Sequence, residues 1–164
     1  MGTTTPARSS LDGIGPVTAR RPLGEVLEFL RALWGLNHEL ESASRRMKSR
    51  LGVTGPERMV VRLVGRYPGI SAGDLARILR LHPSTLTGLL KRLVARRILR
   101  RGTDAVDARR ALFSLTPQGA AVDRVSRGTV EAALTAALAS LPPGEVRAAA
   151  SVLEALERTL RGKR

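Results

Sequence analysis

The sequence contains no cysteine among its 164 residues. Disulfide bonds, thiol-based redox sensing and cysteine-ligated metal sites are therefore excluded. The two histidines, His38 and His82, lie far apart and outside any cluster with the spacing of metal ligands, so we expect neither a metal nor another cofactor. The chain also has no phosphate-binding loop and no nucleophile beside a credible base. These absences argue against an enzyme.

Long apolar runs are missing as well. No stretch approaches the roughly 20 residues that a membrane-spanning helix needs, and the first residues, MGTTTPARSSLDGIGPVTARRP, lack the apolar core of a signal peptide. We therefore expect a soluble cytoplasmic protein that does not bind a membrane. The length, with 43% apolar residues, suits one domain of ordinary size with a real core.

Positive charge is abundant and unevenly distributed. The chain has 28 Lys and Arg against 14 Asp and Glu, a net charge of +14. Between Pro56 and Gly119 there are 13 basic and 4 acidic residues, whereas residues 1–55 have 8 and 5, and residues 120–164 have 7 and 5. Charge alone, without regard to the missing apolar runs, indicates an anionic partner, which could be nucleic acid, a membrane surface or an acidic protein. Charge that served only solubility would not be concentrated in the middle of the chain.

The first half of the chain predicts a tail followed by helices. Residues 1–21 are rich in small and polar residues, which is typical of a flexible tail. Apolar residues recur at three- and four-residue spacing over residues 22–51 and predict a long helix, whose wide apolar stripe indicates packing against another chain. The capping-box pattern of Thr54 and Glu57 marks the start of a second helix, and a short third helix is expected from Ser71.

A fourth helix is expected from Pro83, because proline suits the first helical position. Its apolar residues from Leu86 to Val94 form one amphipathic stripe. A short helix, a tight turn and a second helix together are the pattern of a helix-turn-helix. The alternative for its polar face is an ordinary solvated surface. We expect this face to contact DNA bases and phosphates, through Ser84, Thr85, Thr87, Gly88, Lys91 and Arg92.

The next segment predicts a β-hairpin. Residues 98–101 and 111–115 can pair as two antiparallel strands, and the loop between them carries Arg109 and Arg110. A protruding arginine suits the narrow, electronegative minor groove of DNA. Asp107 lies two residues before Arg109, where a carboxylate can orient a guanidinium. The alternative is a solvated hairpin with a local salt bridge of little energetic value.

The last third of the chain is expected to be helical. Thr116 is a candidate cap with Pro117 at the first helical position, and apolar residues from Val122 to Leu138 predict one continuous helix. A break at residues 141–144 precedes a final helix from Val146 to Leu160.

The expected fold class is therefore mainly α with a small β-wing. It is a winged helix-turn-helix over residues 54–115, flanked by dimerisation helices at residues 22–51 and 116–164.

One motif carries a family resemblance. The motif consists of D-x-R at Asp107–Arg109, five variable residues at Arg110–Ser114 and L-T-x-x-G at Leu115–Gly119. With the helix order over residues 22–161, the chain resembles the MarR (multiple antibiotic resistance regulator) family of transcription factors. Members often have glycine where this chain has Arg97. Arg97 either adopts a positive φ at some cost or the helix ends differently.

The resemblance implies a homodimer that binds a roughly palindromic DNA operator, most commonly as a repressor. The fourth helix would enter the major groove and Arg109 the minor groove. It also implies a small-molecule effector, often an aromatic or phenolic anion, in a pocket for which Trp34, His38, Met59 and Arg62 are candidates. Plain core packing is the alternative for Trp34 and Met59, and a surface position for His38. The competing functions are a ligand-independent winged-helix DNA binder, an architectural DNA-binding protein and a protein-interaction module.

Overall fold

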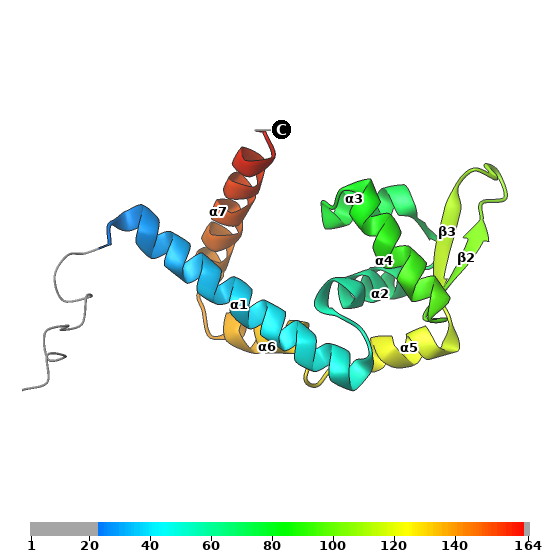
Figure 1. The fold of residues 1–164 in the computed structure, drawn as a ribbon, viewed down its shortest axis with the longest axis horizontal. Coiled ribbons are helices and arrows are strands. Elements are labelled where there is room, and N and C mark those ends of the chain that lie inside the picture. Colours follow the sequence, from blue (N-terminus) through cyan, green and yellow to red (C-terminus); the bar gives the residue numbers. More distant parts are fainter. Residues whose placement is uncertain (1–22, 163–164) are drawn as a thin grey trace, which may run out of the picture. The chain divides into compact units, whose positions relative to one another are not determined.

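The computed structural model describes residues 23–162. They belong to two compact units, one ending at His38 and the other beginning at Glu39, and helix α1 runs through this boundary. The predicted tail at residues 1–21 lies outside the described residues. The elements (Figure 1) are α1 (Glu25–Leu51), α2 (Gly55–Arg66), β1 (Ile70–Ser71), α3 (Ala72–Leu79), α4 (Pro83–Ala95), β2 (Leu99–Thr103), β3 (Ala111–Leu115), α5 (Pro117–Arg124), α6 (Val130–Ala139) and α7 (Pro143–Arg161).

Within the second unit, α2, α3 and α4 pack with a three-stranded antiparallel sheet to form a winged helix. The strand order is β1-β3-β2, and β2 pairs with β3 from Leu99 opposite Leu115 to Thr103 opposite Ala111. The predicted fold class, mainly α with a small β-wing, is confirmed. The core consists of buried aliphatic side chains and one phenyl ring, from Val53, Val60, Val61, Val64, Ile70, Leu75, Leu86, Leu89, Leu90, Leu93, Ile98, Leu99 and Phe113.

The predicted starts of the winged-helix helices are confirmed. The Thr54 hydroxyl accepts from the N–H of Glu57, and the Glu57 carboxylate accepts from the N–H of Thr54, so both halves of the capping box are present. Ser71 caps α3 by accepting from the N–H of Asp74. Pro83 begins α4, and Nδ1 of His82 caps it by accepting from the N–H of Ser84, a role that the sequence did not indicate.

Two arginines end helices in the left-handed region. Arg80 after α3 has φ 52°, and Arg97 after α4 has φ 54°. At Arg97 the N–H of Ile98 donates to the carbonyl of Leu93, and the N–H of Arg97 donates to that of Val94, which is the Schellman pattern. The first of the two alternatives for Arg97 is therefore correct: the helix ends as it would with glycine, and the backbone adopts the costly conformation.

The L-T-x-x-G segment joins the wing to α5 by close contact. The Thr116 hydroxyl accepts from the N–H of Gly119 at 3.0 Å and donates to the carbonyl of Arg97 at 2.5 Å. The N–H of Thr116 donates to the carbonyl of Ile98 at 3.1 Å. Gly119 is buried, and a Cβ there would overlap the Ile98 carbonyl oxygen. The first turn of α5 therefore lies directly on the backbone that leads into β2.

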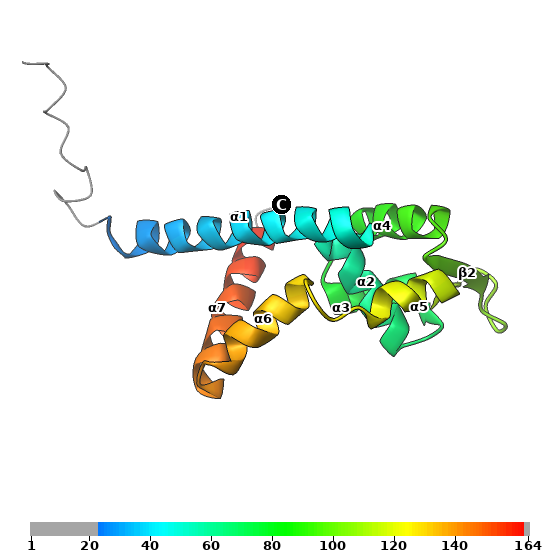
Figure 2. The same ribbon diagram turned by 90° about the horizontal axis from the view of Figure 1, so that it is seen from below.

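Three details of the sequence prediction need correction. The single helix expected from Val122 to Leu138 is wrong, because α5 ends at Arg124 and α6 begins only at Val130 (Figure 2). Gly128 in the break has φ 69°, which a continuous helix does not allow. The first wing strand is Leu99–Thr103 rather than 98–101, and β1 was not predicted because two residues carry no alternation pattern.

Helices α6 and α7 have no buried residues. Five of their large apolar side chains are 41–75% exposed, at Leu134, Leu138, Val152, Leu153 and Leu160. Among the described residues, no helix is long and apolar enough to span a bilayer.

Candidate nucleic-acid interface

Helix α4 places its apolar and polar residues on different faces. Leu86, Leu89, Leu90 and Leu93 are at most 5% exposed and form the core side. The first turn contains no acidic residue, so the positive end of the helix dipole has no neutralising carboxylate on α4 itself. This helix end therefore offers a favourable position for a phosphate.

The predicted polar face of α4 is accessible. Ser84, Thr85, Thr87 and Lys91 are all exposed. The Thr87 hydroxyl donates to the Pro83 carbonyl, and the Ser84 hydroxyl lies 2.7 Å from Nδ1 of His82. The structure therefore brings these side chains together on one surface.

Gly88 belongs to the same face and is half-buried. A Cβ at Gly88 would lie 3.5 Å from an Arg92 nitrogen, which is an ordinary contact, and the helix conformation needs no glycine there. Nothing within the described chain demands glycine at this position. A need for glycine at this position would come from a binding partner that approaches α4 closely.

Arg92 differs from its neighbours because Glu57 holds it. Its Nε donates to Oε1 of Glu57 at 3.1 Å, and Nη1 of Arg96 donates to Oε2 at 3.4 Å. Burial raises the pKa of Glu57, but the Thr54 N–H and the two guanidinium groups lower it more, so the net pKa lies below the ordinary value. The Arg92 side chain is still 58% exposed, so part of it remains available to a phosphate.

The wing loop is shaped by two aspartates that cap the backbone. Oδ1 of Asp104 accepts from the N–H of Val106 at 2.9 Å, and Oδ1 of Asp107 accepts from the N–H of Arg109 at 3.0 Å. The Asp107 carboxylate thus bonds the Arg109 backbone, whereas the sequence suggested that it could orient the guanidinium. Within residues 23–162 the Arg109 side chain makes no ion pair or hydrogen bond, and it is exposed. The turn therefore presents this arginine outward.

Arg110 is placed differently from Arg109. Its guanidinium nitrogens lie 3.7 Å from Asp74 and 3.8 Å from Asp104. The Ser71 hydroxyl, followed by the charges of Arg77 and Arg110, lowers the pKa of Asp74 although partial burial opposes this. Arg110 therefore lies between the wing and α3.

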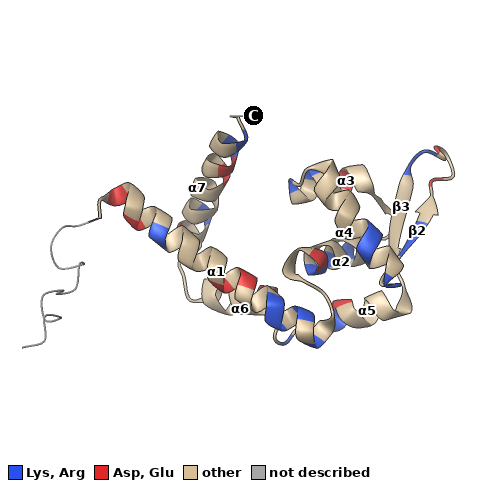
Figure 3. Ribbon diagram, viewed as in Figure 1, with Lys and Arg blue, Asp and Glu red and all other residues tan. Residues whose placement is uncertain are grey.

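Basic residues are frequent on α4 and on the wing. Figure 3 shows Lys and Arg positions on α4 and along both arms of the wing, with acidic positions at the wing tip. These basic positions are Lys91, Arg92, Arg100, Arg101, Arg109 and Arg110. The helix and the wing together offer a positively charged surface to a polyanion.

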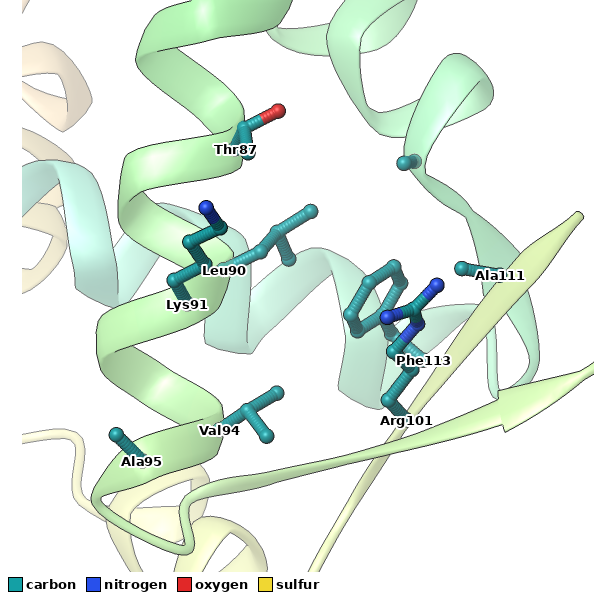
Figure 4. A pocket seen from close by; sticks show the side chains of 9 residues that line it. Thr87, Leu90, Lys91, Val94, Ala95, Arg101, Ala111 and Phe113 are labelled. Carbon is teal, nitrogen blue, oxygen red and sulfur yellow. The ribbon is translucent and has the colours of Figure 1, made fainter.

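A cleft of about 430 Å³ lies between α4 and the wing. Figure 4 shows Leu90 and Val94 directed from α4 toward Phe113, with Arg101 beside the ring. Lys91 and Arg101 are exposed, so the cleft combines an apolar surface with two positively charged side chains. The sequence did not predict this cleft. Its lining residues are Ala72, Thr87, Leu90, Lys91, Val94, Ala95, Arg101, Ala111 and Phe113.

The residues predicted for an effector pocket do not line one cavity. Met59 lines a cavity of about 540 Å³ beside α6, and Arg62 lines another of about 660 Å³, where it pairs with Asp123 at 2.8 Å. Trp34 and His38 are exposed on α1 in the first unit. Core packing, the alternative for Trp34 and Met59, is wrong for the single chain, since they are 67% and 53% exposed.

Sequence reasoning also missed two buried charges on α2. Glu57 and Arg58 are 3% and 2% exposed. A usable signal existed for Glu57, because Val60, Val61 and Val64 follow it at i+3, i+4 and i+7 and place it on the buried stripe. No group of three or more His, Asp or Glu within the described residues could hold a metal ion.

Comparisons with known proteins agree with this geometry. The family model of the MarR family matches residues 51–110. The chain is 30% identical over 135 residues to the HTH-type transcriptional repressor Rv2887 of Mycobacterium tuberculosis, covering 82% of this chain and 93% of the repressor. The same values hold for the HTH-type transcriptional repressor Mb2911 of Mycobacterium bovis.

Two solved structures with DNA have a similar fold. S. aureus MepR in complex with DNA has a TM-score of 0.66 at 18% identity, covering 84% of this chain and 99% of that one. A mutant MarR from E. coli complexed with operator DNA has a TM-score of 0.64 at 23% identity, covering 80% and 94%. At these identities the likeness concerns the fold.

Proposed function

The chain belongs to the MarR family of DNA-binding transcriptional regulators, and from this membership we propose that it is a homodimeric repressor of a specific, roughly palindromic operator. The observation that carries the proposal is the exposed polar face of α4 beside a basic wing. The relatives from Mycobacterium are named as repressors, which favours repression over activation. A regulator of this kind acts on the chromosome, so we place it in the cytoplasm with the nucleoid.

The proposed DNA contacts divide between helix and wing. Short polar side chains at the start of α4 read base edges in the major groove, and Gly88 allows close approach. Lys91 and the exposed part of Arg92 contact phosphates. Arg109 enters the minor groove, and Asp107 supports it by holding the turn rather than by pairing with its guanidinium.

The proposed dimer is formed by residues 22–51 and 116–164, with residues 54–115 as the DNA-binding module. The exposed apolar side chains of α6 and α7 support this division, because a soluble helix seldom leaves such a face open. A second copy brings two α4 helices to successive major grooves, about 10 base pairs apart.

We further propose that a small aromatic or phenolic anion releases the operator. The cleft between α4 and the wing suits such a ligand, because Phe113 and Leu90 offer apolar surface and Lys91 and Arg101 offer charge. This cleft is a better candidate for the ligand site than the residues predicted from sequence, because Arg62 among them already forms an ion pair with Asp123. Since Thr87 and Lys91 belong to both the cleft and the proposed DNA surface, ligand and DNA would compete.

A competition experiment at constant salt tests the central proposal. The affinity for the intergenic DNA upstream of the protein's own gene is compared with that for random DNA of equal length. A specific repressor should prefer the former by about 10³-fold or more. Equal affinities would instead identify an architectural or non-specific DNA binder, the alternative function. Sedimentation of the free protein tests the homodimer separately.

A further inference from the structure

Helix α2 carries two adjacent charged side chains that are both buried. Glu57 and Arg58 are the only charged residues of the described chain that are almost fully buried, at 3% and 2% exposed. Successive residues on a helix point about 100° apart, so the two side chains leave α2 in different directions. Each of them binds a different neighbouring element.

Arg58 binds the junction between α5 and α6. Its Nη1 donates to the carbonyl of Val122, and Nη2 donates to Asp123 O at 3.1 Å and to Val125 O at 2.6 Å. Its Nε donates to Oε1 of Glu131 at 2.7 Å. The three carbonyls belong to the end of α5, where helices leave acceptors unsatisfied, and Glu131 belongs to the first turn of α6. One guanidinium therefore joins the end of one helix to the start of the next.

Two other side chains hold parts of this junction, but neither binds both helices: Arg62 binds Asp123 of α5, and Thr129 caps α6. Helix α5 has 8 residues and α6 has 10, and helices this short are marginal without tertiary contacts. Gly128, within the break, has a positive φ, and five residues separate the two helices. A planar guanidinium with donors in set directions defines the angle at such a junction, whereas an ammonium group cannot reach the same four acceptors together.

Glu57 connects the same helix to α4. Its carboxylate binds Arg92 in the last turn of α4 and Arg96, which caps the end of that helix. Helix α2 is therefore linked to the proposed recognition helix through Glu57 and to the α5–α6 junction through Arg58. A change in the angle between α5 and α6 therefore changes the orientation of the whole winged helix relative to α6.

We propose that Arg58, with Glu131, is a positioning residue that sets the orientation of the winged helix relative to the dimerisation helices and thereby selects the half-site spacing of the operator. The inference rests on the homodimer of the proposed function. One added base pair moves a half-site by about 3.4 Å and turns it by about 35°. The protein is therefore sensitive to half-site spacing only if the angle between the winged helix and the dimerisation helices is fixed.

The first test needs no DNA. Because the chain has no cysteine, Ile78→Cys on the exposed side of α3 gives one spin-label site per protomer in the full-length protein. Electron–electron double resonance then measures the distance distribution between the two labels. Arg58→Met and Arg58→Lys should broaden or displace the distribution. Arg66→Met is the matched control, since it removes an exposed arginine from the same helix and should leave the distribution unchanged.

The outcomes separate the two proposals. Should Arg58→Met fail to fold, Arg58→Lys and Glu131→Gln decide, because Glu131→Gln keeps the three carbonyl bonds of Arg58. An unchanged distribution in the folded dimers of both variants overturns the positioning role. No dipolar coupling in the otherwise unchanged protein overturns the homodimer instead.

The second test uses operators with one base pair added or removed between half-sites. If altered spacing removes half of the free energy that corresponds to a 10³-fold preference, wild-type affinity for these operators falls by about 30-fold. For Arg58→Lys and Glu131→Gln we expect the same change in spacing to lower affinity by less than about 5-fold. The ratio between two operators does not depend on the folded fraction, so reduced stability cannot imitate the result. An equal ratio in wild type, Arg66→Met and Arg58→Lys contradicts the inference.

Discussion

Gly119→Ala should destabilise the protein strongly, although alanine normally favours a helix. A Cβ at Gly119 would overlap the carbonyl oxygen of Ile98 and lie 3.1 Å from the carbonyl carbon and 3.4 Å from Cδ2 of Leu115. The overlapping atom is backbone and cannot turn aside as a flexible side chain can. Relief therefore requires the first turn of α5 to move away from the segment before β2 by on the order of 1 Å.

The magnitude follows from the contacts that this movement disturbs. The N–H of Thr116 donates to Ile98 O, and its hydroxyl donates to Arg97 O. Losing these two hydrogen bonds costs about 2 kcal/mol, and overpacking adds about 1–3 kcal/mol. The higher helix propensity of alanine returns about 1 kcal/mol. The free energy of unfolding should fall by about 2–4 kcal/mol.

Urea unfolding followed by circular dichroism measures this difference, at one protomer concentration because dimerisation contributes to stability. The melting temperature should fall by about 5–15 °C. The matched control is Gly144→Ala in α7, where no atom lies within 4 Å of the new Cβ; it should be neutral or stabilise by up to about 1 kcal/mol. If Gly119→Ala is as stable as this control, the account of the L-T-x-x-G contact is wrong.

The remaining predictions concern the wing, a helix end and a buried carboxylate. Arg109→Ala should weaken operator binding by about 1–3 kcal/mol in a gel-shift titration while dimer and helicity persist; unchanged binding would refute the minor-groove role. Lys91→Ala should reduce the salt dependence of binding by about one phosphate contact, and an unaltered slope argues against that contact. Arg97→Gly should stabilise by about 0.5–1 kcal/mol in thermal unfolding, because it removes the Cβ penalty of positive φ at some entropic cost; Arg97→Ala keeps the Cβ and should not stabilise. The lowered pKa of Glu57 means that its contribution to stability is complete above the ordinary value of 4.5 and is lost as pH falls through the folded-state pKa. Glu57→Gln should therefore show a weaker loss of stability on acidification below about pH 4.5, and an identical pH profile would contradict this.

Local chemistry made much of the fold predictable. The capping residues Thr54 and Ser71, and the first-position proline at residue 83, act over three or four residues, and such signals are legible along a sequence. The stripe from Leu86 to Val94 likewise identified the helix that carries the DNA-facing side chains.

Most of the failures concern features that apolar periodicity does not encode. Apolar spacing continues through residues 122–138, so the break between α5 and α6 could not be read from periodicity. Gly128 and the cap Thr129 were local signals of this break that the sequence reasoning passed over. Arg58, which binds across the break, lies 73 residues before Glu131 in the chain. The link between Glu57 and Arg92 spans 35 residues, and the cleft beside Phe113 exists only because the wing folds back toward α4.

For the D-x-R motif too, the sequence predicted one part of the site and the tertiary structure decided the other. Its spacing placed Arg109 in the wing and separated it from Arg110. The tertiary structure decided how Asp107 acts, since its carboxylate accepts the backbone N–H of Arg109, and brought Arg110 toward Asp74 across the gap to α3. The sequence by itself thus determined the order of the winged-helix helices and of the two wing strands, the helix starts at Thr54 and Ser71, and the basic character of the DNA-facing segment, because these depend on neighbours along the chain. Only the tertiary structure decided the partners of the buried charges, because desolvating a charge is tolerable only where folding supplies its counter-charge and hydrogen bonds.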